Sequence, residues 1–155
     1  DMVEQGLEAE EIVKRVNELA GKVDASFIIN SLEYLYKGGR CSALSMLGAN
    51  LLKLKPCIEV KNGKMGVGKK YRGKFGDVLL EYVKERLSDK DDIVTNRVFI
   101  THAGCDEEIV KSVTELVKSL VPFDEVFITR AGCTISSHCG ADTLGVLFLR
   151  KSDVS

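Results

Sequence analysis

Residues 98–129 read VFITHAGCDEEIVKSVTELVKSLVPFDEVFIT, in which two short apolar runs flank an amphipathic segment. The runs 98–101 and 126–129 are partly β-branched, and each predicts a strand. Segment 106–120 has apolar residues at three- and four-residue spacing and acidic residues in its first turn, which predicts a helix. A strand, a helix and a second strand in this order favour an α/β fold.

The alternation of helices and strands continues on both sides of this stretch. The Asn62-Gly63 pair predicts a tight hairpin turn, because both residues tolerate positive φ. The other predicted elements are helices at 7–20, 32–37 and 74–87, strands at 26–29, 56–60, 64–71 and 144–149, a further apolar, helix-compatible stretch at 43–52, and a loop at 131–142. Together they predict one two-layer α/β domain over 1–155, with helices packed on a mixed β-sheet.

Composition and charge exclude several classes of protein. The chain has 155 residues and a net charge of −1, so no overall basic field favours nucleic acid. No run approaches the ~18 consecutive apolar residues of a membrane span, and the acidic start lacks the positive charge of a signal peptide. The five cysteines are odd in number and form no Cys-x-x-Cys pair, which is typical of reduced thiols in a cytoplasmic protein. We expect no cofactor.

One stretch imitates a nucleotide-binding P-loop. Gly63, Gly68 and Lys69 match the first part of the G-x-x-x-x-G-K pattern, but Lys70 stands where Ser or Thr would hold magnesium. The match also begins at the predicted hairpin turn, whereas a P-loop lies between a strand and a helix. A cationic hairpin strand is therefore the better interpretation.

Two arginines are candidates for binding an anion. Arg40 follows the pair Gly38-Gly39, which is either a plain helix stop or a place where the backbone approaches a ligand or another domain. An arginine at that point would offer a rigid fork of donors to a carboxylate or phosphate. Arg72, after the second hairpin strand, is either a solvated charge or a second cation near the ligand or on a docking face.

Segment 136–145 combines hydroxyl groups, glycines and one histidine just before an apolar strand. Here His138 and neighbouring N–H and O–H groups could donate to an anionic oxygen away from water, and Thr143 belongs to the same segment. A metal site is a weaker interpretation, because each of the two histidines has cysteines near it only in sequence. Nothing marks a cysteine of low pKa that would act as a nucleophile. His102, at a predicted strand end, is most simply structural.

Five segments, in order, resemble the DegV family of fatty-acid-binding proteins. They are 30–35 running into Lys37-Gly38-Gly39-Arg40, then 51–56, Tyr71-Arg72-Gly73, Thr101-His102-Ala103, and 137–140 before Thr143-Leu144-Gly145. The match covers nearly the whole chain. The resemblance implies the C-terminal domain of a two-domain protein, because the family's N-terminal lipid-binding domain has no counterpart in these residues.

The resemblance also implies a function. Members of the family hold a long-chain fatty acid with two α/β domains, and in bacteria they present its carboxylate to a separate kinase subunit that phosphorylates it with ATP. It implies a cytoplasmic binding subunit for phospholipid synthesis, with catalysis in the kinase subunit. By matching position, it assigns Gly39, Arg40, Arg72, His138 and Thr143 to the fatty acid head group and to phosphotransfer.

The chain departs from the family pattern in the head-group segment. The family usually has His-Cys-Gly-Pro, then Gly or Asn, then Thr, whereas Ala141 and Asp142 stand here. Loss of the proline loosens the segment, and a carboxylate at position 142 disfavours an anionic ligand unless it points away or pairs with an arginine. A second interpretation is therefore a protein–protein interaction module that retains no lipid. A His/Cys metal hydrolase is a third, and it requires bound zinc.

Overall fold

The computed structural model describes residues 1–39 and 54–154. Six strands form one sheet in the order β3-β2-β1-β6-β4-β5. Their bounds are β1 Val23–Ile29, β2 Leu54–Lys61, β3 Lys64–Arg72, β4 Ile93–Ala103, β5 Glu125–Arg130 and β6 Thr143–Arg150. β4 and β5 are parallel and the other neighbours are antiparallel, so the predicted mixed sheet is confirmed.

The hairpin between β2 and β3 turns at Asn62 and Gly63, whose φ angles are +50° and +70°. Both central residues are left-handed, as a type I′ turn requires, and the predicted turn is confirmed. On β3, Lys69 forms an ion pair with Glu85 of the following helix. The stretch that imitates a P-loop is therefore a strand whose lysine is paired within the protein.

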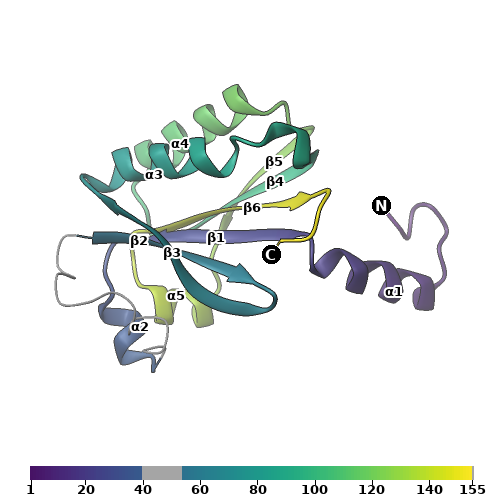
Figure 1. Cartoon of the computed structure of the whole chain (residues 1–155), viewed down its shortest axis with the longest axis horizontal. Helices are drawn as coiled ribbons and strands as arrows, with labels where there is room; N and C mark the ends of the chain where they lie inside the picture. Colours follow the sequence, from purple (N-terminus) through teal and green to yellow (C-terminus); the bar gives the residue numbers. More distant parts are fainter. Residues whose placement is uncertain (40–53, 155) are drawn as a thin grey trace.

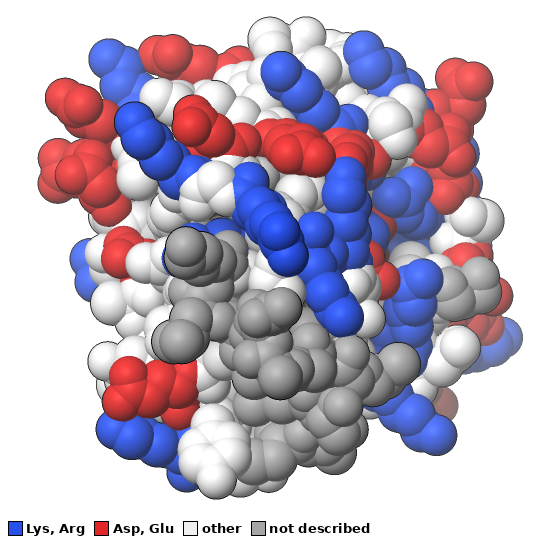
Figure 2. Space-filling model, turned by 60° about the vertical axis from the view of Figure 1, so that its left-hand side comes forward, with Lys and Arg blue, Asp and Glu red and all other residues white. Residues whose placement is uncertain are grey.

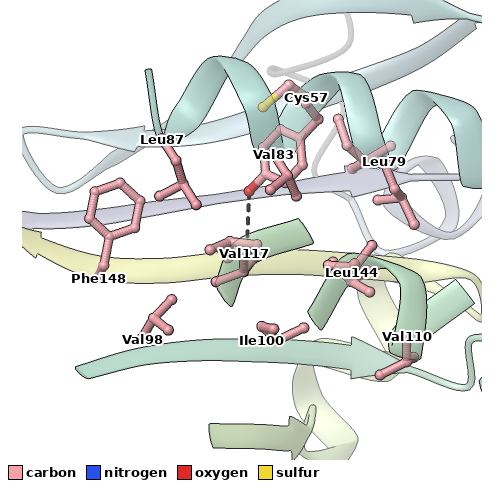
Figure 3. Close-up of a cluster of buried hydrophobic side chains, with 14 of the residues drawn as sticks. Cys57, Leu79, Val83, Leu87, Val98, Ile100, Val110, Val117, Leu144 and Phe148 are labelled. Atoms are coloured by element: carbon pink, nitrogen blue, oxygen red, sulfur yellow. Dashed lines mark hydrogen bonds between the residues drawn. The ribbon is translucent and has the colours of Figure 1, made fainter. Parts of the chain in front are cut away.

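Helices α3 (Phe75–Arg86) and α4 (Glu107–Leu120) cover one face of the sheet (Figure 1). The Asp106 side chain caps α4 by accepting a hydrogen bond from the N–H of Glu108 at 2.8 Å. The main core lies between these helices and the sheet, as Figure 3 shows. Its buried side chains include Leu79, Val83, Leu87, Val98, Ile100, Val110, Val117, Leu144 and Phe148.

The opposite face of the sheet carries two short helices, α2 (Glu33–Lys37) and α5 (Cys133–Cys139) (Figure 1). A smaller core there consists of Ile29, Leu35, Ile58 and Cys139. The two-layer arrangement is thus formed by the sheet with α3 and α4, and α2 and α5 cover one end of the second face. Helix α1 (Ala9–Ala20) extends away from the sheet and has no buried residue.

Helix α5 contradicts the predicted loop at 131–142. It ends at Gly140, whose φ is +79°. The hydroxyl-rich sequence conceals the helix, because Ser136 and Ser137 donate to carbonyls of their own segment and do not disrupt the turn. Burial of Cys139 stabilises a seven-residue helix that is too short to form by propensity alone.

Two further outcomes concern element bounds. The strand predicted at 98–101 is part of β4, which begins at Ile93, and its pairing with β6 is irregular between Val94 and Val98. The polar residues 95–97 lie at this irregularity and interrupt the apolar pattern, so the sequence alone does not indicate that the strand begins at Ile93. The predicted segment 43–52 lies outside the described residues.

In the ranges 1–39 and 54–154, no helix is both long and apolar enough to cross a membrane.

Candidate functional site

One end of the sheet gathers the segments that the sequence marks as a binding site. β1 and β3 finish there, β6 begins there, and α2 and α5 lie beside it (Figure 1). Antiparallel pairing explains the convergence, because Ile29 is opposite Thr143 and Leu54 is opposite Arg72. Residues that are far apart in the sequence are thereby brought to the same end of the molecule.

His138 lies on α5 with its ring against the backbone of Gly38, at the end of α2. A Cβ on residue 38 would overlap the Nδ1 atom of His138, so this approach requires glycine. The Nδ1 atom is buried and has no hydrogen-bond partner among the residues that the structure describes. The half-buried ring is therefore held by packing, and Nε2 is the nitrogen left to meet a ligand.

A second glycine contact holds α5 against α2. A Cβ on Gly140 would overlap the ring of Tyr34, and Gly140 also has a φ of +79°. Gly39 differs, since its φ is +73° but a Cβ there would meet no atom of the described residues within 4 Å. Gly38 and Gly140 thus let two helices touch, whereas Gly39 serves the turn after α2. Arg40 follows Gly39 in the sequence and lies outside the described residues.

Thr143 is a predicted head-group residue whose hydroxyl already has a partner within the protein. It donates to the carbonyl of Cys139 at 3.1 Å, and the side chain is buried. The Thr143 carbonyl in turn accepts a hydrogen bond from the Cys105 thiol at 3.3 Å. These bonds tie the end of α5 to the start of β6. A direct contact of Thr143 with a ligand stays a prediction.

Asp142 is bonded to the protein at the end of β1. Its carboxylate accepts a hydrogen bond from the Asn30 amide at 3.2 Å, and its carbonyl accepts one from the Asn30 N–H at 3.1 Å. Lys55 donates to the carbonyl of Asn30 at 3.0 Å, so Asn30 also contacts a cation. The φ of Asp142 is +53°, a conformation that Gly, Asn and Asp tolerate best. The departure from the family's Gly or Asn therefore preserves the backbone and gives the carboxylate a partner.

Charged side chains cross the face of the molecule that Figure 2 turns forward, where Lys and Arg lie directly beside a row of Asp and Glu. Arg72 is exposed, and its guanidinium has no hydrogen bond or ion pair with any residue in the described ranges. A free arginine at this place suits either a second cation near an anionic ligand or a docking face.

His102, Cys57 and Cys105 have pKa values that burial shifts. Burial, with a smaller contribution from Arg130, lowers the pKa of His102, whose Nδ1 atom is buried and has no hydrogen-bond partner in the ranges 1–39 and 54–154. Burial raises the pKa of Cys57 and of Cys105 to about 12, so these thiols are poor nucleophiles at neutral pH. In the part of the chain that the structure describes, no three His, Cys, Asp or Glu side chains come together as a metal site would require.

Three residues that hold this end of the sheet together are absent from the predicted site. Asn30 and Lys55 position the segment around Asp142, and Tyr34 packs on Gly140. A polar residue that ends a buried strand, as Asn30 does, is a signal that the sequence does offer. The sequence gives no comparable signal for Tyr34, because its partner lies in a distant segment.

Comparison with known proteins extends these observations. The DegV family model matches residues 1–151. A curated fatty acid-binding protein of Thermotoga maritima is 32% identical over 149 residues, which are 94% of this chain and 50% of that protein. The chain spans about half the length of the curated relatives it matches.

Solved structures share the fold. A structure from Thermotoga maritima, described as revealing fatty acid binding function, has a TM-score of 0.75 and 27% identity, and the match covers 96% of this chain and 51% of that chain. The Streptococcus pneumoniae fatty acid kinase B3 protein, loaded with linoleic acid, has a TM-score of 0.79 over 100% of this chain and 53% of that chain. Its identity is 19%, so this second likeness concerns the fold alone.

Proposed function

The chain belongs to the DegV family, and from this membership we propose that it is the part of a fatty-acid-binding protein that holds the lipid carboxylate beside His138. The observation that carries the proposal is the packing of the His138 ring on Gly38. This packing sets an imidazole next to the glycine pair that precedes Arg40 in the sequence. The Thermotoga maritima relative, named a fatty acid-binding protein, supports the same ligand class.

The proposed chemistry is recognition of a carboxylate by charge-assisted hydrogen bonds. His138 would donate from Nε2, and Arg40 and Arg72 would supply guanidinium groups, which suit a carboxylate or an acyl phosphate. The hydrogen bond from Asn30 satisfies part of the Asp142 carboxylate, which reduces its repulsion of a bound anion. Burial of the acyl chain would supply most of the affinity, at about 0.8 kcal/mol per methylene group.

We further propose that this domain works together with a second domain that holds most of the acyl chain. The chain spans about half the length of its curated relatives, which supports this division. Helix α1 also supports it, because Val13 and Val16 are 60% and 52% exposed on a helix with no buried residue. An apolar stripe left in water is expected to be covered in the working protein. A separate kinase subunit would then phosphorylate the presented carboxylate.

The test is native mass spectrometry of the natural-length protein purified from cells, followed by denaturation and identification of the released lipid. We expect about one fatty acid per protein. In a His138→Ala variant we expect the affinity for added fatty acid to fall by about tenfold or more, as loss of a charge-assisted hydrogen bond implies. Ser137→Ala is the matched control, since Ser137 is the exposed neighbour of His138 on α5. Equal affinity of the His138 and Ser137 variants would contradict the proposed role.

A second candidate function is a docking module that retains no lipid. Arg72 is exposed and has no partner in the described ranges, and α1 carries an exposed apolar stripe. Both features suit a protein partner as well as a second domain. An empty protein that also rejects added fatty acid would favour this candidate over the carrier.

A further inference from the structure

β5 is an open edge of the sheet. In the described part of the chain it pairs with β4 alone, at one end of the strand order. Its sequence, EVFITR, exposes Phe127 by 38% and Ile128 by 52%, contains neither proline nor lysine, and carries its charged residues, Glu125 and Arg130, only at its two ends. Natural proteins usually protect an edge strand with such residues, with a bulge or with a covering segment. An edge without this protection is expected to pair with another strand.

The surroundings leave room for an added strand. On the side of α4, a groove of about 530 Å³ runs between the helix and β5, and Ile128, Val110 and Thr114 contribute to its walls. On the other face, the ring of Phe127 stacks on Phe99 with 5.2 Å between the ring centroids. Phe99 and Phe127 are opposite one another on β4 and β5, so the stacked rings lie on a face of the sheet.

We propose that this edge pairs with β5 of a second copy of the chain, antiparallel across a twofold axis at Phe127. This symmetry sets Phe127 of one copy opposite Phe127 of the other. It likewise sets Val126 opposite Ile128, and Asp124 opposite Arg130, of the other copy. Asp124 and Arg130 are exposed, and neither side chain has a hydrogen-bond or ion-pair partner in the described ranges. The pairing therefore forms two symmetry-related ion pairs around an apolar centre, while the aromatic stack continues from one copy into the other.

The charges select this register. A twofold axis at Ile128 would set Val126 opposite Arg130, and an axis at Val126 would set Asp124 opposite Ile128. Each of these alternatives buries one charge against an aliphatic side chain and leaves the other unpaired. The strand is self-complementary when it is centred on Phe127, and for this reason the inferred partner is a second copy of the chain.

The test is sedimentation velocity of the natural-length protein over a concentration series, with three charge variants. We expect a concentration-dependent dimer whose dissociation constant rises about tenfold in Asp124→Arg and in Arg130→Asp, because each variant sets like charges opposite one another twice. The double variant exchanges the two charges, and we expect it to dimerise about as well as the natural protein. A protein that stays monomeric at the highest concentration, or a dimer that none of the variants changes, overturns the proposal.

A cysteine at the proposed axis gives a second readout. Phe127→Cys, made with Cys133→Ser because the native thiol of Cys133 is exposed, sets two thiols opposite one another. We expect rapid formation of a covalent dimer under mild oxidation, since directly opposite residues have Cβ atoms ~5 Å apart. Met65→Cys in the same background is the control, because Met65 is 39% exposed and lies on β3, at the opposite edge of the sheet. Cross-linking of the control at the same rate as the Phe127 variant overturns the proposed axis.

Discussion

The imidazole of His138 and the α-carbon of Gly38 touch so closely that no methyl group fits between them. Gly38→Ala must therefore displace the ring or separate α2 from α5. We expect the variant to lose about 1–3 kcal/mol in the free energy of unfolding, as overpacked sites do, measured by urea denaturation. We also expect weaker binding of fatty acid by the natural-length protein, because the imidazole can no longer keep its position.

Gly132→Ala is the matched control for this prediction. Gly132 lies directly before α5 with a φ of −64°, and a Cβ there would meet no atom within 4 Å. We expect this variant to lose only about 0.5–1 kcal/mol in the free energy of unfolding, because alanine is a weaker N-cap than glycine but its methyl group meets no neighbour. If Gly38→Ala were as stable as Gly132→Ala and bound lipid equally well, the contact with Gly38 would not be what holds His138.

Much of the fold is readable from local sequence. The periodicity of 106–120 with a capping Asp106 gives α4, and the Asn62-Gly63 pair gives the hairpin, because both signals act within a few residues. α5 is not readable in this way. Its serines favour turns, and what stabilises the helix is the burial of Cys139 and the contact with α2, which come from distant parts of the chain.

The candidate site also has some features that the local sequence predicts and others that depend on contacts between distant segments. His138 and Arg72 stand out in the sequence through their residue types and through the resemblance to a known family. The contact between His138 and Gly38 does not, because a glycine that ends a helix looks the same whether or not a ring lies against it. The role of Asp142 is equally hidden, since its hydrogen bond joins it to Asn30, 112 residues earlier in the sequence.

The left-handed backbone at Asp142 leads to a second prediction. Its φ is +53°, so Asp142→Asn should keep both the conformation and a hydrogen bond with Asn30. We expect less than about 0.5 kcal/mol change in the free energy of unfolding for the Asn variant, and about 1–2 kcal/mol loss for Asp142→Val, since a β-branched residue is strained there. Urea denaturation of both variants measures the difference. Equal stability of the two would show that the conformation at position 142 is not constrained.

A fully buried carboxylate supplies the third prediction. Asp24 is 0% exposed and pairs with Arg86 and with Arg150, whose Nε lies 2.7 Å from a carboxylate oxygen. Asp24→Asn would remove the buried carboxylate that pairs with the guanidinium groups of Arg86 and Arg150. Because breaking a buried pair leaves buried charge without compensation, we expect a loss of about 3–5 kcal/mol in the free energy of unfolding. The control is Glu11→Gln, which removes an exposed pair with Arg15 and should cost no more than about 0.5 kcal/mol.

If the Asp24 and Glu11 variants unfolded at the same urea concentration, the buried pairs would contribute nothing beyond a surface pair. A loss confined to Asp24→Asn would locate a large share of the stability where β1 and β6 run side by side, because Asp24 lies on β1 and Arg150 on β6.

The fourth prediction concerns pH. Burial, together with Arg130, lowers the pKa of His102 below the value of about 6.5 expected in the unfolded chain. The folded state therefore binds fewer protons than the unfolded state. The free energy of unfolding is at its full value above pH ~6.5, where His102 is neutral in both states. It decreases as the pH falls through the pKa of His102 in the folded state. We expect the urea midpoint of the natural protein to fall between pH 7 and pH 5, where carboxylates remain ionised. His102→Gln cannot take up this proton, so its midpoint should fall less over the same range. An equal fall in both proteins would assign the acid sensitivity to other groups and would show that His102 titrates alike in the folded and unfolded states.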